Sequence, residues 1–201
     1  MLRLLVEPDG PLRGRADWNM AVDDALLRTP GPPTLRLYRW SPAAISLGHF
    51  QDPEDFADVA GEHAIVRRPT GGGAIYHDRE ITFAITSPAD RLPRDLPASY
   101  VALHEVLHVA LAECNVETRA PRRDEVRTSA RPTERWCFAD PAPGDLLTAG
   151  GAKLCGSAQR RISTPEPRVL HHGSLVLVAP RATPFAGAAA HPAPETEARA
   201  K

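Results

Sequence analysis

Three consecutive glycines, Gly71 to Gly73, lie between two segments that are predicted to be β-strands, 64–66 and 81–85. Glycine loses more conformational freedom on folding than any other residue, so three in a row are costly unless the backbone needs them. Either the backbone adopts positive φ angles there, or it approaches a ligand closely. An ordinary glycine-rich hairpin turn explains the spacing equally well. The run matches neither a P-loop nor a dinucleotide fingerprint.

The spacing of apolar residues predicts a mixture of helices and strands. One helix is expected over 17–27, with Asp17 as its N-cap and an apolar stripe made by Trp18, Ala21, Val22, Ala25 and Leu26. A second helix is expected over 99–114, with Cys114 closing its buried stripe. Strands are expected at 35–37, 45–47, 64–66, 81–85 and 174–178, with a hairpin over 145–155. This order favours an α/β or α+β domain in which helices cover a mixed sheet.

Length and charge limit the possible function classes. A chain of 201 residues is expected to form one domain, here 1–180, followed by a poorly packed tail over 181–201 that is rich in Ala, Pro, Glu and Arg. A net charge of -1 argues against nucleic-acid binding. No apolar run is long enough for a membrane span, so a cytoplasmic location is expected. The 3 cysteines form no Cys-x-x-Cys pair, and neither a disulfide framework nor a structural metal site is expected.

A second unusual segment is centred on Lys153, which lies in the second strand of the predicted hairpin among small residues. Lysine seldom packs among small residues unless its ammonium meets an anion or a developing negative charge. A lysine on the solvent side of a hairpin is the alternative. The segment therefore predicts either an anion-binding lysine or an ordinary surface residue.

These segments, taken together, resemble the signature stretches of the biotin/lipoate protein ligase superfamily. The matching stretches are 67–78, 153–161 and 172–175, supported by 19–23 and 45–51, and all five occur in the family's order. The resemblance implies a mixed sheet flanked by helices, an acyl slot beside the glycines and an essential Lys153. The chain ends early for this family, so its C-terminus is expected to be short. The substrate-binding residues implied are Arg68, Thr70, Gly71, Gly72, Gly73, Ala74, His77, Cys155, Gly156, Ser157, Ala158, His172 and Gly173.

Cys137 distinguishes between branches of the family. The segment 136–140 resembles the cysteine loop of the Bacillus-type octanoyltransferases, and it precedes Lys153 by 16 residues. A cation beside a cysteine favours the nucleophilic thiolate, and Lys153 is the candidate cation. A small buried cysteine is the alternative. The resemblance thus implies that Cys137 and Lys153 are the catalytic pair.

The implied reaction moves an octanoyl or lipoyl group from acyl carrier protein, through a Cys137 thioester, to a lysine of a lipoyl-domain protein. Such acceptors include the glycine cleavage H protein and subunits of the 2-oxoacid dehydrogenases. No cofactor or metal is expected for this reaction. The alternatives are an ATP- and Mg-dependent lipoate ligase and a non-catalytic relative that only binds acylated proteins.

Two further features compete for a role in chemistry. Cys155 lies two residues after Lys153, so strand alternation puts both on one face, and Cys155 is interpreted as pocket lining. The segment 104–108 matches the zinc-protease pattern H-E-x-x-H, but no third ligand follows, and partly exposed histidines on an amphipathic helix explain it. His77 is expected to be a structural hydrogen-bonding residue.

Arginines crowd the loop that leads to Cys137. Such a run is usually a solvated loop. Because lipoyl domains and acyl carriers tend to be acidic, the run is also a candidate contact for a carrier protein. Its members are Arg119, Arg122, Arg123, Arg127, Arg131 and Arg135.

Overall fold

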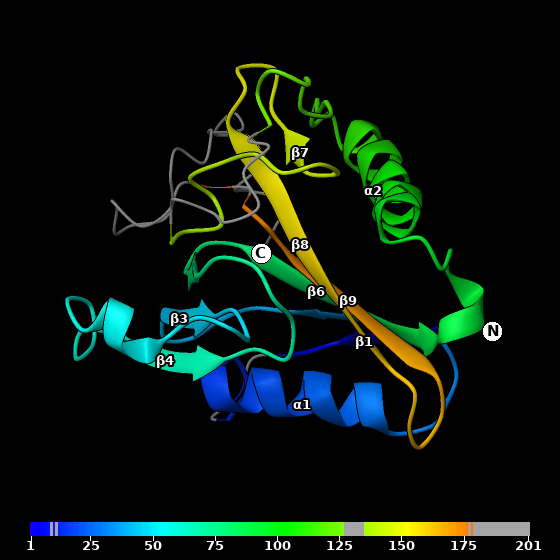
Figure 1. Ribbon diagram of the computed structural model, residues 1–201, viewed down its shortest axis with the longest axis horizontal. Coiled ribbons are helices and arrows are strands. Elements are labelled where there is room, and N and C mark those ends of the chain that lie inside the picture. The colour runs from blue at the N-terminus through cyan, green and yellow to red at the C-terminus, as the bar shows by residue number, and fades with distance from the viewer. Residues whose placement is uncertain (9, 11, 127–134, 177, 179–201) are drawn as a thin grey trace.

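The computed structural model describes residues 1–8, 10, 12–126, 135–176 and 178 of the chain (Figure 1). The tail expected over 181–201 and residue 177 of the strand expected over 174–178 lie outside this range, and the strand observed there ends at Leu175. The α-helices are α1 (Ala16–Arg28) and α2 (Leu96–Glu113), and the short 3-10 helices are η1 (Pro53–Phe56) and η2 (Ala89–Arg91). The strands are β1 (Arg3–Val6), β2 (Thr34–Tyr38), β3 (Ala44–Leu47), β4 (Ala64–Arg67), β5 (Ile75–His77), β6 (Ile81–Pro88), β7 (Leu146–Leu147), β8 (Lys153–Ile162) and β9 (Arg168–Leu175).

The strands form one large sheet and one small sheet. The large sheet has the order β1-β2-β6-β9-β8-β7, and only its β1–β2 pair is parallel. The small sheet has the order β4-β3-β5, with β4 parallel and β5 antiparallel to β3. Long antiparallel strands β6, β9 and β8 cross the middle of the molecule (Figure 1). Mixed sheets flanked by helices confirm the predicted α+β fold class.

The position of β3 between β4 and β5 shows whether the glycine segment, Gly71 to Gly73, is a hairpin turn. β4 and β5 lie on opposite sides of β3, so the chain between them crosses from one edge of the small sheet to the other. A hairpin turn joins strands that are hydrogen-bonded neighbours. Gly71 to Gly73 are therefore not a hairpin turn, whereas the predicted hairpin between β7 and β8 is confirmed by their antiparallel pairing.

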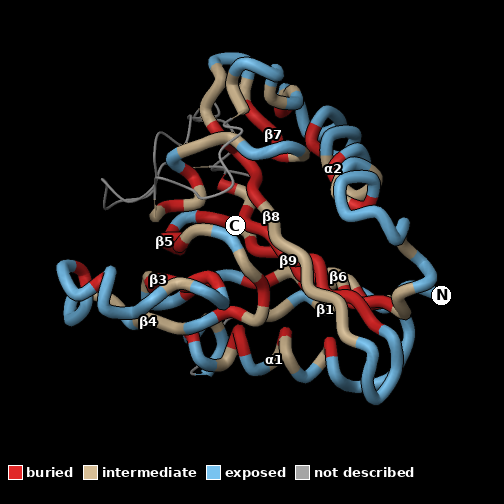
Figure 2. The backbone as a smooth tube through the Cα atoms, in the orientation of Figure 1, coloured by how far each residue is buried: buried red, intermediate tan, exposed pale blue. Residues whose placement is uncertain are grey.

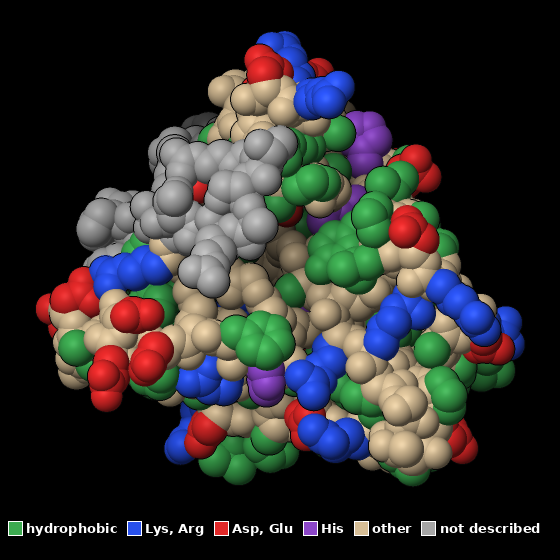
Figure 3. Space-filling model, viewed as in Figure 1, with side chains coloured by type: hydrophobic (Ala, Val, Ile, Leu, Met, Phe, Trp, Pro, Cys, Tyr) green, Lys and Arg blue, Asp and Glu red, His purple; other side chains and the backbone are tan. Residues whose placement is uncertain are grey.

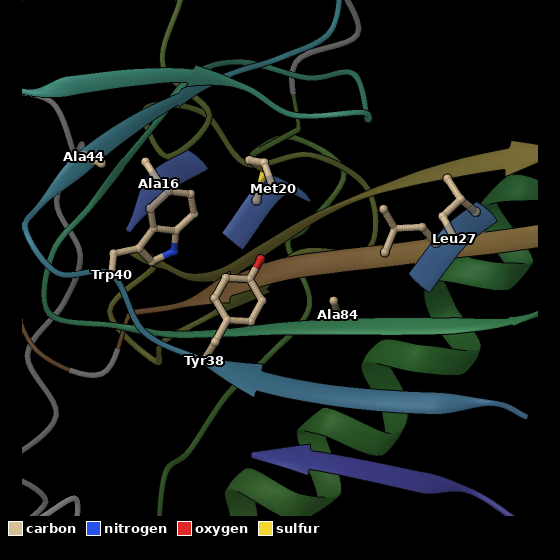
Figure 4. Packing of buried hydrophobic residues seen from close by; sticks show 8 residues of the cluster. Ala16, Met20, Leu27, Tyr38, Trp40, Ala44 and Ala84 are labelled. Atoms are coloured by element: carbon tan, nitrogen blue, oxygen red, sulfur yellow. The ribbon is translucent and has the colours of Figure 1, made fainter. Parts of the chain in front are cut away.

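Helix α1 covers one face of the large sheet, but with a different stripe from the expected one. Its buried residues are Ala16, Asn19, Met20, Asp23 and Leu27, whereas Ala21 and Ala25 are exposed. Figure 4 shows Met20 and Leu27 facing Tyr38 of β2 and Ala84 of β6. The buried face is rotated because Asn19 and Asp23 bond to the buried guanidinium of Arg36. Asp17 is not the N-cap; that position is Arg15, which Asp17 pairs with.

Helix α2 covers the opposite face of the large sheet. Leu107 and Leu111 pack with Phe83 of β6 and Leu154 of β8, and the helix begins at a cap in which Asp95 accepts from the Ala98 amide at 2.9 Å. In Figure 2 the buried parts of both helices point toward the strands. Cys114 is exposed beyond the helix, so its expected place in the core is wrong. Among the described residues, no helix is both long and apolar enough to cross a membrane.

Candidate active site

The glycine segment is held in place by a buried arginine. Arg68 is 3% exposed, and its Nη2 donates to the carbonyl oxygens of Gly71 and Gly73, both at 2.7 Å. Gly72 has a φ of 94°, a conformation that other L-residues rarely adopt. A Cβ on Gly73 would lie 2.8 Å from the Cys137 nitrogen. The glycines are needed, therefore, for one left-handed residue and for close approach of the protein's own backbone.

The backbone that approaches Gly73 belongs to Arg135, Trp136 and Cys137, which are called the cysteine segment below. The Cys137 amide donates to the Ala74 carbonyl at 2.8 Å, and the Ala74 amide donates to the Arg135 carbonyl at the same distance. Trp136, next to the cysteine, packs edge-on against Phe56 of η1 with 5.5 Å between ring centroids. These contacts fix Cys137 beside the glycine segment. Its side chain is partly exposed and lines a pocket.

The ammonium of Lys153 lies next to the Cys137 sulfur. The side chain is 3% exposed, and Nζ lies 2.8 Å from the Cys137 carbonyl oxygen, 3.4 Å from the Asp140 carbonyl oxygen and 3.5 Å from Cys137 Sγ. Gly156 leaves room for this arrangement, since a Cβ there would lie 2.6 Å from Lys153 Cε. The structure thus brings together the two residues that were predicted to be catalytic.

Asp145 completes this group and was missed by the sequence analysis. Its Oδ2 lies 2.7 Å from Lys153 Nζ and accepts from the Ala142 amide at 2.6 Å. Burial alone would lower the pKa of the Lys153 ammonium, but the charges of Cys137 and Asp145 raise it above its ordinary value. Lys153 is therefore a cation at neutral pH. An acidic residue just before a strand carries no signal of its own, so only the fold reveals this partner.

We expect Asp145→Asn to weaken both stability and chemistry. The change leaves the Lys153 charge buried without its counter-ion, which costs about 3 kcal/mol or more. An ammonium that shifts by an ångström slows acyl transfer by about 10- to 100-fold. Urea unfolding and single-turnover acylation measure the two effects. Glu125→Gln is the matched control, because it breaks the partly exposed pair with Arg119, which solvent screens and which contributes little to stability. Unchanged acylation in folded Asp145→Asn would contradict a positioning role.

The pocket beside Cys137 runs between the two sheets and α1. Its free volume is about 30 Å³, and its apolar lining comes from Met20, Tyr38, Trp40 and Ile75. Polar side chains also line it, among them Ser46, Thr82 and Ser174. The predicted binding residues among the lining are Arg68, Gly72, His77, Ser157, Ala158, His172 and Gly173. Met20, Tyr38 and Trp40 had no distinguishing signal, since in sequence they are ordinary core residues.

The other predicted binding residues stand around the pocket without lining it. Gly73 and Ala74 contact the cysteine segment, and Gly156 faces the Lys153 side chain. Gly71 lies beside the ring of Phe50. Thr70 bonds through Oγ1 to His172 Nε2 at 2.6 Å.

Cys155 packs away from the pocket, which corrects its interpretation as pocket lining. It is fully buried in a cluster with Phe83, Leu111 and Leu154, under α2. A register shift opposite Leu146 and Leu147 interrupts the alternation of β8, so residues 153 and 155 do not share a face. Burial raises the pKa of the Cys155 thiol well above its ordinary value. Cys155 is therefore a neutral thiol at physiological pH.

Buried polar networks hold the pocket wall. His77 bonds to Ser46 Oγ and to Glu80 Oε1, both at 2.7 Å, and stacks on Trp40 with 3.8 Å between ring centroids. Burial lowers the pKa of His77, against the effect of the Glu80 charge. His172 links Thr70 to Asp23 of α1, which lies 3.0 Å from its Nδ1. His77 thus has the hydrogen-bonding place in the wall that was expected of it.

The histidines of the H-E-x-x-H pattern have protein partners. His104 bonds through Nε2 to Ser157 Oγ at 2.7 Å, and His108 bonds through Nδ1 to Thr118 Oγ1 at 2.6 Å. His104 is buried rather than partly exposed, and burial lowers its pKa to about 4. No cluster of three or more potential metal ligands occurs within the described part of the chain.

Two arginines of the run are bonded to nearby acidic side chains. Arg119 pairs with Glu125 at 2.7 Å, and Arg135 forms a 2.9 Å bond to Asp58. Arg127 and Arg131 lie outside the described residues. Its expected contact with an acidic carrier stays a prediction.

This combination of fold, glycine segment and buried lysine agrees with a comparison against known families. Residues 15–201 match the model of the lipoyl protein ligase A/B catalytic domain. The chain belongs to this family. Among solved structures, a putative lipoate protein ligase from T. acidophilum has a TM-score of 0.66 at 22% identity and covers 89% of this chain and 68% of that one. Lipoate-protein ligase A bound with ATP gives 0.65 at 23% identity, over 89% and 66% of the two chains. These likenesses show the shared fold of the ligase A/B domain.

Curated relatives of this ligase A/B domain include octanoyltransferases. The octanoyltransferase LipM of Kyrpidia tusciae is 36% identical over 177 residues, which cover 82% of this chain and 63% of the relative. That of Moorella thermoacetica is 39% identical over 174 residues, which cover 79% and 60%. The chain therefore spans somewhat less than two thirds of the length of the curated relatives it matches.

Proposed function

We propose that this protein is a cysteine-dependent acyltransferase that moves an octanoyl group from an acyl-carrier thioester to a lysine of a lipoyl-domain protein. One observation carries the proposal: Cys137 Sγ lines the pocket and lies 3.5 Å from the Lys153 ammonium. A cation at this distance stabilises a thiolate, and a thiolate attacks thioesters readily. The resemblance to LipM octanoyltransferases supports the same assignment.

In the first half of the proposed reaction, the carrier exchanges its acyl group with the enzyme. The Cys137 sulfur attacks the carbonyl carbon of the octanoyl thioester, and the bond from that carbon to the carrier sulfur breaks. The proton lost by the Cys137 thiol ends on the carrier thiol. Octanoyl is then held as a thioester on Cys137, with no nucleotide required, because the acyl group arrives already activated.

In the second half, the neutral amine of the acceptor lysine attacks the Cys137 thioester. A C–N bond forms, the C–S bond breaks, and a proton from the amine passes to the cysteine sulfur. The acceptors proposed are the glycine cleavage H protein and the lipoyl domains of 2-oxoacid dehydrogenases, which would place the reaction in the cytoplasm. The two halves together make a ping-pong mechanism.

Lys153 is the group best placed to stabilise charge in both halves. The amides of Ala74 and Cys137 already donate to backbone carbonyls, so they do not stabilise an oxyanion without breaking those bonds. The Lys153 ammonium has three protons for four neighbouring acceptors, and its sulfur contact is the longest of them. One proton is readily redirected to a developing oxyanion, which a fixed buried charge stabilises strongly.

The acyl chain would occupy the apolar part of the pocket. A volume of about 30 Å³ holds little more than a water molecule, so the lining must move to admit eight carbons. Met20 is the side chain best suited to move, because it is unbranched and tolerates several rotamers. Tyr38 and Trp40 are held more firmly by bonds to Asp23 and Thr82, each of 2.8 Å.

Intact mass spectrometry tests the proposal directly. Octanoyl-carrier protein, without ATP, is expected to add one octanoyl mass to the enzyme. Neutral hydroxylamine is expected to remove it, because thioesters are cleaved under conditions that spare amides. Octanoylation that requires free octanoate together with Mg-ATP would replace the transferase by a ligase. Failure under both conditions would leave a protein that only binds acyl groups.

A further inference from the structure

An exposed aromatic ring lies beside the glycine segment, of which Gly72 lines the pocket, and this edge of the pocket is called its mouth below. Phe50 is 89% exposed, and it follows β3 at the point where the chain passes the glycine segment. A Cβ on Gly71 would lie 3.8 Å from the Phe50 ring, and the next residue, Gly72, lines the pocket with Cys137. A single exposed apolar side chain is common on protein surfaces. The basic side chains near Phe50 indicate what kind of surface this ring belongs to.

Two arginines lack acidic partners in the described part of the chain: one bonds to the backbone on both sides of Phe50, and the other bonds to the backbone just before the glycine segment. Arg67 donates from Nη1 to the carbonyls of Gly48, His49 and Gln51, and Arg160 donates to the carbonyl of Pro69 at 3.0 Å. Within the described part of the chain, no carboxylate forms an ion pair with either. The buried Arg36 and the surface Arg119, in contrast, are both paired with carboxylates.

Figure 3 shows hydrophobic, histidine and basic side chains next to one another on the viewed face. An exposed aromatic ring with unpaired arginines is the composition that protein interfaces favour, since Phe and Arg are enriched there. Positive charges without internal partners attract an acidic surface. The mouth therefore suits an acidic protein.

The length of the reacting side chain tells which protein must touch this surface. A lysine carries its amine on only four methylenes, so the body of the acceptor must come close to the Cys137 thioester. The arm of an acyl carrier is several times longer and allows the carrier to stay farther away. Residues at the mouth of the pocket thus meet the acceptor rather than the donor.

We propose that Phe50, Arg67 and Arg160 form a docking surface for the acceptor, an acidic domain that presents its target lysine to Cys137. This inference rests on the proposed acyltransferase function and names the surface that recognises its second substrate. Acidic residues of the neighbouring η1 region, Asp52, Glu54 and Asp55, are exposed on one side of Phe50 in the chain. They repel an acidic partner, so the docking surface and the η1 region together set the orientation of the acceptor.

The experiment separates docking from chemistry by using two nucleophiles on one acyl-enzyme. The enzyme is first octanoylated with a small thioester, octanoyl-N-acetylcysteamine, and freed of donor. Transfer to an unlipoylated lipoyl domain is then compared with cleavage by hydroxylamine, which needs no docking. In Phe50→Ala and in Arg160→Glu, kcat/KM for the lipoyl domain is expected to fall by about 10-fold, mainly through slower association. Hydroxylamine cleavage is expected to stay within about twofold.

Three further variants test whether the loss of transfer is specific to the position and charge of the docking residues. Val106→Ala removes an apolar side chain that is 67% exposed on α2, and it is expected to leave transfer unchanged. Arg160→Lys keeps the charge and is expected to retain most of the transfer rate that Arg160→Glu loses. Arg122→Glu places the same charge reversal in the arginine run, which is the alternative contact for an acidic acceptor, and it is expected to lower transfer less than Arg160→Glu does.

Three results would overturn the docking surface. The first is normal lipoyl-domain transfer by both Phe50→Ala and Arg160→Glu. The second is a parallel loss of hydroxylamine cleavage, which shows that the residues support the pocket instead. The third is a larger loss in Arg122→Glu than in Arg160→Glu, which moves the docking site to the arginine run. If the unaltered enzyme forms no acyl-enzyme at all, the proposed function itself fails.

Discussion

Cys137→Ser is expected to fold normally and to form no detectable acyl-enzyme. The substitution replaces one partly exposed atom and leaves the backbone bonds of the cysteine segment to Ala74 in place. A serine hydroxyl has a far higher pKa than a thiol, and a protonated Lys153 cannot act as the base that would activate it. We expect acylation by octanoyl-carrier protein to fall on the order of 10³-fold or more. Intact mass spectrometry with circular dichroism measures the loss and the fold.

Cys155→Ser supplies the control for this prediction. Cys155 is a fully buried thiol among apolar side chains, and burial raises its pKa, so it is not a nucleophile at neutral pH. A hydroxyl there costs about 1–3 kcal/mol of stability but leaves acylation intact. Peptide mapping of the trapped acyl-enzyme gives an independent result. An octanoyl group found on Cys155, and retained in Cys137→Ser, would make Cys155 the nucleophile.

The two cysteines show what sequence patterns predict and where they fail. Strand alternation put Cys155 beside Lys153, but a bulge opposite Leu146 and Leu147 breaks the alternation. A bulge depends on the pairing of two strands, which the apolar pattern of one strand does not reveal. The proximity of Cys137 to Lys153 came from a family resemblance, not from spacing, because a separation of 16 residues fixes no distance.

The apolar spacing in the sequence predicted where the helices lie better than it predicted which of their faces are buried. Apolar spacing found α1 within one residue at each end, yet it chose Ala21 and Ala25 for a face that is exposed. The true buried face contains Asn19 and Asp23, polar side chains whose partner Arg36 lies on β2. Hydrophobic patterning does not detect a buried ion pair, because each charged residue, taken by itself, is of a type that usually lies on the surface. The same reasoning explains why Asp145 was missed.

Lys153→Ala is expected to abolish octanoyl transfer while the protein stays folded. The ammonium stabilises the Cys137 thiolate and the developing oxyanion, so its removal acts on the transition state. We expect a loss on the order of 10²- to 10³-fold, the range seen when one such donor is removed. The free energy of unfolding is expected to fall as well, by about 3–5 kcal/mol, because Asp145 is left buried without its partner.

That penalty makes a second variant necessary. Lys153→Met with Asp145→Asn removes both charges, keeps the length of the side chain and restores much of the stability, because a buried ion pair is often replaceable by neutral groups. We expect this double variant to be as inactive as Lys153→Ala but closer to the original protein in urea unfolding. Lys153→Arg keeps a cation, and we expect it to retain partial activity. Transfer at nearly the normal rate in the folded double variant would remove Lys153 from the mechanism, because a folded protein without that charge would then still acylate Cys137.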